Sequence, residues 1–386
     1  MIYLDHNATS PLRDCAKRAM LEALEETGNA SSVHGAGRRA RARVEKAREQ
    51  LAKLCGAAPS SVIFTSGGTE ANALALRGAV AGALAAEDRI TRIFISSIEH
   101  ESVRANALAI ADTVPGVKLN EIPVTRDGAV DCAAFRLALM QGKGRVLVSV
   151  MAANNETGVI QDLAEVARIV HAEGSDGALL HVDAVQAAGR VPLAFDSLGM
   201  DYLTVSAHKL GGPQGAGALL VKEGAPLSSC IAGGGQEMGR RSGTENVAAI
   251  AGFGAAAEET SNLSESEGLA ELRDAFEREL KTIATPAIFG AGAKRLPNTS
   301  NFAIPGLSAE TALIALDLDG IAVSSGSACS SGKVKPSHVL SAMGVDENLA
   351  RGGLRVSFGW SSKKDDVSAI LASLRKLLAR QAAIAA

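Results

Sequence analysis

The stretch RVLVSVMAANNETGVIQDLAEVARIVHAEGSDGALLHVDAV, residues Arg145–Val185, contains two strongly apolar runs separated by an amphipathic one. RVLVSVM and ALLHVDAV are predicted strands, and LAEVARIVHAEG between them is a predicted helix. A strand, a helix and a second strand in this order form a unit whose strands are parallel and buried on both faces. The stretch therefore predicts an α/β fold with a mostly parallel sheet.

The same alternation extends in both directions along the chain. Further strands are predicted at 62–66, 92–97, 201–207 and 217–223, and helices at 11–26, 35–54, 69–84 and after His100. A polar stretch at 258–271 separates this part from a shorter α+β pattern with a helix at 308–318 and a terminal helix from Lys363. We therefore expect a large domain at 15–260 and a small α+β domain formed by 1–14 and 261–386, which carries a cysteine loop at 324–335.

Composition excludes several classes of function. The 386 residues are 47% hydrophobic and 21% charged, as in soluble globular proteins. A net charge of −3 and 3% aromatic residues argue against a protein that binds nucleic acid or an anionic membrane. The first residues do not resemble a secretory leader, and no apolar run reaches the roughly 18 residues of a membrane span. Five scattered cysteines indicate a reducing cytoplasm, and no close histidine or cysteine pair suggests a metal site.

Polar residues gather directly after five of the apolar runs. In open parallel sheets, ligands bind beyond the carboxyl ends of the strands. These residues are therefore expected to line a single crevice; the five clusters are Thr65–Thr69, Ser97–His100, Asn154–Glu156, His181–Gln186 and Ser206–Lys209.

Three of these clusters have chemistry that suits pyridoxal phosphate when they are taken together. SGGTE (Ser66–Glu70), before a helix, can bind a phosphate, although it could equally be an ordinary glycine turn with a helix cap. Asp183 could protonate a pyridine nitrogen or simply form a salt bridge, and Lys209 could bond to an aldehyde or be a solvated lysine. His100 could stack on the ring and shuttle protons, or be an ordinary buried histidine. The cofactor explains all of them at once.

The motifs SGGTEANA, EHESV, ANNETGVIQD, HVDAVQAAGR, SAHKLGGPQG, RRSGTEN, SSGSACSSG and PSHVL together resemble the pyridoxal-phosphate-dependent cysteine desulfurases of iron–sulfur cluster assembly. The resemblance covers nearly the whole chain, from YLDHNATSP to LRVSFGW. It implies the aspartate-aminotransferase-like fold (fold type I of the pyridoxal-phosphate enzymes) and a homodimer. The length of the cysteine loop resembles the long-loop branch, whose members act directly on scaffold proteins.

The resemblance also implies a role for each matching residue in cofactor binding. Lys209 would bond to the cofactor aldehyde, Asp183 would pair with the pyridine nitrogen, and His100 would stack on the ring. The remaining cofactor contacts implied by the resemblance are Gln186 and Asn155 near the phenolic oxygen, Gly68, Thr69, Ser206 and His208 at the phosphate, and Thr244 at the phosphate of the other subunit.

For the substrate, L-cysteine, the resemblance implies that Arg355 and Asn155 bind it and that Cys329 receives its sulfur. Arg355 suits a carboxylate because its guanidinium is planar and forked, although it could be a surface arginine. Cys329, alone among small residues, would take the sulfur as a persulfide and pass it to a scaffold protein or another acceptor. The other four cysteines are expected to be inert in helical or apolar segments.

Three other interpretations of the sequence remain open. A selenocysteine lyase or a β-eliminating lyase would share the fold and the cofactor. A sulfur-relay or scaffold protein could keep the fold without catalysis. A nucleotide-binding domain is the third, although the chain has neither GxGxxG nor GK[ST].

Overall fold

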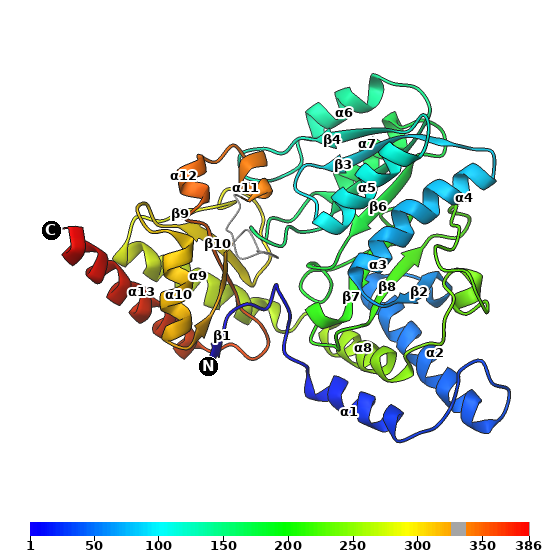
Figure 1. Cartoon of the computed structure of the whole chain (residues 1–386), viewed down its shortest axis with the longest axis horizontal. Coiled ribbons are helices and arrows are strands. Elements are labelled where there is room, and N and C mark those ends of the chain that lie inside the picture. Colours follow the sequence, from blue (N-terminus) through cyan, green and yellow to red (C-terminus); the bar gives the residue numbers. More distant parts are fainter. Residues whose placement is uncertain (326–336, 386) are drawn as a thin grey trace.

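The computed structural model describes residues 1–325 and 337–385 of the chain. These residues form two lobes, each built around its own β-sheet (Figure 1). The first residues of the chain lie in the smaller lobe, and helix α1 (Asp14–Leu24) packs against α8 (Val247–Thr260) in the larger one. The chain therefore crosses between the lobes near its start and again after α8.

The larger lobe contains a seven-stranded sheet in the order β2-β8-β7-β6-β5-β3-β4. Six strands of this sheet run in one direction and only β8 runs opposite to them, so the predicted α/β class with a mostly parallel sheet is confirmed. The strands are β2 (Val62–Thr65), β3 (Ile90–Ser96), β4 (Lys118–Ile122), β5 (Arg145–Met151), β6 (Leu179–Asp183), β7 (Tyr202–Ser206) and β8 (Gly217–Val221).

Helices cover both faces of this sheet, and the side chains of β5 show why. Val146, Val148 and Val150 belong to the core on one face, whereas Leu147 belongs to the core on the other. A strand buried on both faces is the expected consequence of helical connections between parallel strands. The first face is covered by α2 (Gly35–Cys55), α6 (Cys132–Met140), α7 (Leu163–Glu173) and α8, and the second by α3 (Gly68–Ala73), η2 (Leu74–Gly78), α4 (Ala79–Ala85) and α5 (Glu101–Thr113).

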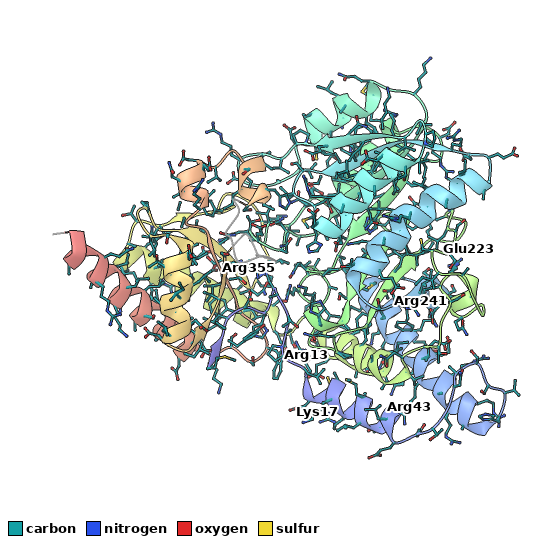
Figure 2. The ribbon with its side chains drawn as sticks, in the orientation of Figure 1. Arg13, Lys17, Arg43, Glu223, Arg241 and Arg355 are labelled. Atoms are coloured by element: carbon teal, nitrogen blue, oxygen red, sulfur yellow. The ribbon has the colours of Figure 1, made fainter. Side chains whose placement is uncertain are left out.

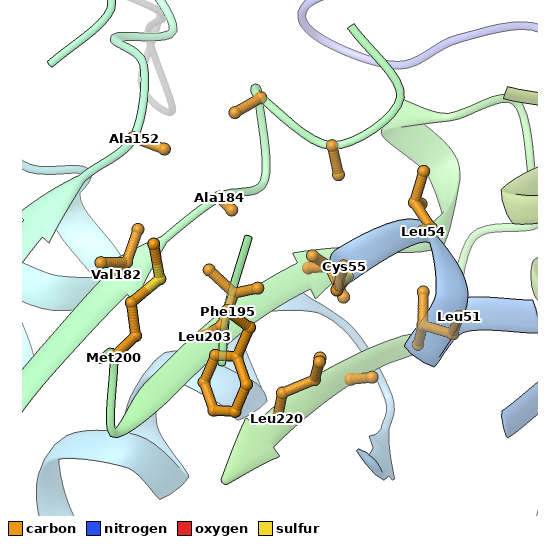
Figure 3. Close-up of a cluster of buried hydrophobic side chains, with 14 of the residues drawn as sticks. Leu51, Leu54, Cys55, Ala152, Val182, Ala184, Phe195, Met200, Leu203 and Leu220 are labelled. Carbon is orange, nitrogen blue, oxygen red and sulfur yellow. The ribbon is translucent and has the colours of Figure 1, made fainter. Parts of the chain in front are cut away.

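Figure 3 shows part of the core on the first face, where side chains from α2 meet the sheet. Leu51 and Cys55 of α2 are fully buried beside Leu203 and Leu220 of the sheet. Burying a leucine side chain of this size contributes about 2 kcal/mol to folding. This continuous core fixes the ends of the strands relative to one another, and it thereby positions the residues that follow them.

The smaller lobe contains an antiparallel sheet in the order β12-β13-β10-β9 and a short parallel pair, β1 with β11. Phe276, Phe302 and Phe358 pack edge to face at the centre of its separate core. Its elements are β1 (Ile2–Tyr3), α9 (Ser266–Ile283), β9 (Ala287–Ile288), β10 (Thr299–Ala303), α10 (Ala309–Leu318), β11 (Ile321–Ala322), β12 (Ser324–Ser325), α11 (His338–Ala342), α12 (Glu347–Ala350), β13 (Leu354–Ser357) and α13 (Lys364–Ala385).

The separate cores support the proposed division into a large domain at 15–260 and a small one at 1–14 and 261–386. A mixed cluster joins them, in which Ile98 and Met151 of the larger lobe pack with Val339, Leu340 and other buried side chains of the smaller lobe. We therefore keep the division as a proposal in which the two domains share one apolar contact. Among the described helices, none combines the length and the apolarity needed to span a membrane.

Candidate active site

A cavity of about 340 Å³ lies where strands β5, β6 and β7 end and the two lobes meet. Its walls contain both large-lobe residues that follow the strands and small-lobe residues of β12 and β13. Among the residues that line it are the following from the sequence prediction: Gly68, Thr69, His100, Asn155, Asp183, Gln186, Ser206, His208, Lys209 and Arg355. The structure thus brings the predicted clusters to one place.

Lys209 ends a short turn, η3 (Ala207–Lys209), that directly follows β7. Its Nζ donates hydrogen bonds to the carbonyl oxygens of Asn7, at 2.5 Å, and Ala8, at 2.8 Å. Burial lowers the pKa of Lys209 to about 7, helped by the nearby positive charges of Arg355 and Arg190. A large share of this amine is therefore uncharged near neutrality, as attack on an aldehyde requires.

Asp183 is the last residue of β6 and is only 5% exposed. Its Oδ2 accepts a hydrogen bond from Nδ2 of Asn72 at 2.8 Å, and its Oδ1 accepts one from the backbone N–H of Val185 at 3.0 Å. A buried carboxylate is costly unless its oxygens are paired in this way. The two donors fix the Asp183 carboxyl at the cavity wall, where it could pair with a protonated ring nitrogen.

His100 precedes helix α5 and caps its first turn. Nδ1 of His100 accepts a hydrogen bond from the backbone N–H of Ser102 at 3.1 Å, so neutral His100 carries its proton on Nε2. The structure thus sets the tautomer of a ring that lines the cavity. His100 therefore presents an Nε2–H on the ring side away from the helix.

The predicted phosphate contacts lie around the start of α3. Gly68 and Thr69 are the first residues of α3, which continues through η2 into α4, so their free backbone N–H groups and the helix dipole favour an anion. Ser206 Oγ is buried and has no hydrogen-bond partner within the described residues. Burial lowers the pKa of His208 to about 4, so His208 is neutral at pH 7 and can donate a single hydrogen bond.

Arg355, in β13, lies between the two lobes (Figure 2) and is 6% exposed. Its Nη2 is 2.7 Å from Oδ1 of Asp5, and its Nη1 donates to the carbonyl oxygen of Asn155 at 3.0 Å. Nε of Arg355 is buried and has no partner in the described part of the chain. One edge of the guanidinium therefore remains available to an acidic ligand in the cavity.

Two predicted residues are not part of this cavity in a single chain. Thr244 is exposed in the loop before α8, so its contact with the phosphate of another subunit stays a prediction. Cys329 and the rest of 326–336 lie outside the described residues. For one other cysteine the prediction was wrong: Cys230 is exposed in the loop that follows β8, because this polar loop forms neither a helix nor a strand.

Several residues of the site were not predicted from sequence. Asp5 and Asn7 reach it because the chain start runs between the lobes, and Asn72 reaches it because it lies one helical turn after Gly68. The polar run DHNATS after an apolar strand-like start was a usable signal for the first two. Asn72 could have been found by its spacing from the phosphate motif.

Two buried glutamates, Glu99 and Glu156, lie next to cavity residues. They were included in the predicted polar clusters, but no role was predicted for either one. Burial raises the pKa of Glu99 above its ordinary value, and Oε1 of Glu99 accepts from the backbone N–H of Met151 at 2.6 Å. Burial raises the pKa of Glu156 to about 7, against the opposing effects of a hydrogen bond from Ser337 and of the Arg355 charge. Both follow predicted strands, but burial cannot be read from a single carboxylate in a sequence.

Pyridoxal phosphate fits the residues that are present. The Ser206 hydroxyl, which no described residue pairs with, lies beside a helix start and suits the phosphate. The Asp183 carboxyl suits the pyridine nitrogen, and the Lys209 amine suits the aldehyde.

Comparison with known proteins gives a consistent result. The family model described as aminotransferase class-V matches residues 2–370. The cysteine desulfurase IscS of Dictyoglomus turgidum is 42% identical over 98% of this chain and 94% of its own length. The crystal structure of a NifS-like protein from Rickettsia africae has a TM-score of 0.87 and 37% identity, covering 98% of this chain and 99% of its own. SspA in complex with cysteine has a TM-score of 0.79 and 26% identity, covering 93% and 99%.

Proposed function

Because the chain belongs to the aminotransferase class-V family and, within it, to the cysteine desulfurases, we propose that it removes sulfur from L-cysteine and releases L-alanine. The sulfur is transferred to Cys329 as a persulfide and then passed to an acceptor protein of iron–sulfur cluster assembly or of another sulfur-containing cofactor. The observation that carries the proposal is that Lys209, Asp183 and Arg355 reach one cavity from different elements. The structure of SspA with cysteine supports the choice of substrate.

The enzyme depends on pyridoxal phosphate, which, when bound, withdraws electrons from the substrate carbons. The residues of the chain have separate tasks. Asp183 would pair with the protonated ring nitrogen, because Asn72 and Val185 hold its carboxyl in place as a hydrogen-bond acceptor. Lys209 supplies the amine, and His100 offers its Nε2–H as a hydrogen-bond and proton donor.

Arg355 binds the substrate carboxylate in this proposal. Its guanidinium is buried and oriented by Asn155 and Asp5, and its Nε–H has no partner among the residues that the structure describes. The Cys329 thiolate would then attack the substrate sulfur. A bond between the two sulfurs forms as the carbon–sulfur bond breaks, so L-cysteine and the enzyme thiol give L-alanine and the enzyme persulfide, and the atoms balance.

A direct assay tests this function against its rivals. Purified enzyme, cofactor and L-cysteine should yield alanine and a Cys329 persulfide in equal amounts in one turnover, measured by amino-acid analysis and intact mass. A selenocysteine lyase would give alanine from selenocysteine but little from cysteine. A β-eliminating lyase would give pyruvate, and a non-catalytic scaffold would purify without a visible chromophore.

Arg355→Lys should raise the KM for L-cysteine about 10- to 100-fold while changing kcat much less. Lysine keeps the charge but cannot form two parallel hydrogen bonds to a carboxylate. Steady-state alanine formation at varied cysteine concentration measures both constants. Arg351→Lys, on the exposed end of α12, is the matched control and should leave both constants unchanged.

The rate at which cofactor-free protein attaches the cofactor covalently should depend on pH in a way that follows the lowered pKa of Lys209. The uncharged amine attacks the aldehyde, and its fraction rises with pH through a midpoint of about 7. The rate of covalent attachment should therefore rise between about pH 6 and 8 and then level off, followed by absorbance in stopped flow. A rate that keeps rising through pH 9 would contradict the assignment, because an ordinary lysine titrates near 10.4.

We further propose a homodimer in the cytoplasm. Thr244, which is exposed in the loop before α8, would complete the phosphate site of the second subunit. The scattered cysteines support a reducing compartment. The net charge of −3 supports protein and small-molecule partners rather than nucleic acid or membranes.

A further inference from the structure

A network of hydrogen bonds joins Asp183 and His100, two cavity residues that follow different strands of the large sheet. It runs from Asp183, at the end of β6, through the side chains of Asn72 and Ser102 to the imidazole of His100. Asn72 and Ser102 also line the cavity. The network therefore connects the carboxyl that would pair with the ring nitrogen of the cofactor to the histidine that would stack on the ring.

Asn72 uses both hydrogens of its amide in this network. Its Nδ2 donates to Oδ2 of Asp183 at 2.8 Å and to Oγ of Ser102 at 2.9 Å. The opposite orientation of the amide would set its oxygen against the Asp183 carboxylate, and two acceptors would then face each other. Asn72 is only 1% exposed, so losing either bond would leave a buried donor unpaired. The amide is therefore held in one orientation.

The hydroxyl of Ser102 is oriented as a consequence. Its Oγ already accepts from Asn72, and Nδ1 of His100 lies 2.8 Å from it. The same Nδ1 accepts from the backbone N–H of Ser102 at 3.1 Å, so it carries no hydrogen when the ring is neutral. The hydroxyl hydrogen must then point from Oγ to Nδ1. One serine thus gives two hydrogen bonds to one nitrogen of His100.

These two bonds fix the orientation of the His100 ring as well as its tautomer. His100 is an exposed residue, so packing alone restrains its ring little. Turning the ring over about its Cβ–Cγ bond would put a carbon in the place of Nδ1 and lose both bonds. That loss favours the observed orientation by roughly tenfold or more. Ser102 can act in this way because it lies in the first turn of α5, where its backbone N–H has no partner within the helix.

We propose that Asn72 and Ser102 are positioning residues for His100. Ser102 holds the ring with Nδ1 toward the start of α5 and the proton on Nε2, and Asn72 keeps the Ser102 hydroxyl in the orientation that this requires. Because the same amide binds Asp183, the carboxyl and the imidazole are held in one fixed relation, as a single flat ring that contacts both would need. This inference deepens the proposed function and rests on it.

Ser102→Ala tests the network without altering Asp183 or Lys209. Full-length cofactor-free protein with 15N-labelled histidine is measured by NMR at about pH 8.5, where an ordinary imidazole is neutral. The His100 signals are identified by their loss in His100→Gln. In the wild type, Nδ1 of His100 should have the chemical shift of a hydrogen-bonded acceptor. In Ser102→Ala, this signal should move toward the value of a free acceptor, because only the longer backbone bond remains.

Asn72→Leu tests whether the amide acts through the serine. It should move the same Nδ1 signal in the same direction, because the released Ser102 hydroxyl is free to turn away from the ring. The double variant Asn72→Leu/Ser102→Ala should show no larger displacement than Ser102→Ala alone. Displacements that add would mean that Asn72 affects His100 independently of Ser102, which contradicts its proposed role.

The loaded enzyme gives a second measurement. Ser102→Ala should lower kcat for alanine formation about tenfold, because a misoriented His100 no longer presents its Nε2–H. KM should change less than about twofold, since Arg355 and Asn155 bind the substrate in the proposed function. Ser102→Thr retains a hydroxyl and should recover most of both the rate and the wild-type Nδ1 shift.

Asn106→Ala is the matched control. Asn106 lies one turn later on α5, and its Nδ2 donates to the carbonyl oxygen of Ser102 at 2.7 Å. The variant therefore loosens the same turn without removing the hydroxyl, and the His100 signal and kcat should stay unchanged. An unchanged His100 signal in Ser102→Ala overturns the inference, as does an equal change in Asn106→Ala. If the wild-type enzyme forms no alanine, the proposed function falls and the positioning role with it, whereas a missing NMR effect in an active enzyme rejects the positioning role alone.

Discussion

Lys209→Ala is expected to abolish covalent attachment of the cofactor and to lower alanine formation by about 10³-fold or more. The structure places no second amine in the cavity, whose described lining contains only this lysine. Asp183, Ser206 and the start of α3 are untouched, so pyridoxal phosphate should still bind reversibly. Borohydride reduction followed by intact mass measures attachment, and dialysis followed by visible absorbance measures retention.

Lys222→Ala is the control for this experiment. Lys222 directly follows β8, the antiparallel strand, and therefore lies at the edge of the sheet opposite the cavity, with a half-exposed side chain near Asp201. It should retain both attachment and activity. A Lys209→Ala protein that still gains the mass of reduced cofactor would mean that another lysine forms the bond, and the proposed site would be wrong.

The core of the larger lobe was predictable because its strands are short, apolar and followed by polar clusters. Periodicity predicted helices at 35–54 and 69–84, where the structure has Gly35–Cys55 and a continuous helix from Gly68 to Ala85. It did not predict that β8 runs antiparallel, since direction depends on the connections and not on side-chain pattern. Strand β4, with its partly polar sequence KLNEI, lies at the sheet edge and was also missed.

Site residues such as Lys209 and Asp183 were predicted from sequence because the motifs around them are specific to the chemistry. Site residues that contact the others only through the tertiary fold were not predicted. Asp5 is more than 300 positions from Arg355 in sequence, yet their side chains are in contact because the chain start runs between the lobes. Glu156 was only one member of a polar cluster until the fold placed Ser337 against it. Such pairs depend on tertiary packing, which a single sequence does not encode in any local pattern.

Cys329→Ser is expected to separate binding of the cofactor and of L-cysteine, which should persist, from sulfur transfer, which should be lost. The cofactor should bind normally and its absorbance should change on addition of L-cysteine, because the cavity residues lie on other elements. Persulfide formation should fall below detection, since a serine hydroxyl is not deprotonated near neutral pH and is a much weaker nucleophile than a thiolate. Quenched mass spectrometry and labelled sulfide transfer to an acceptor would measure the loss.

Cys230→Ser is the matched control, because Cys230 is an exposed cysteine on a loop of the larger lobe, and desolvation keeps the pKa of its thiol above the ordinary value. A raised pKa leaves little thiolate at pH 7, so this variant should retain persulfide formation. If sulfur transfer instead survived in Cys329→Ser and disappeared in Cys230→Ser, the accepting thiol would have been misassigned.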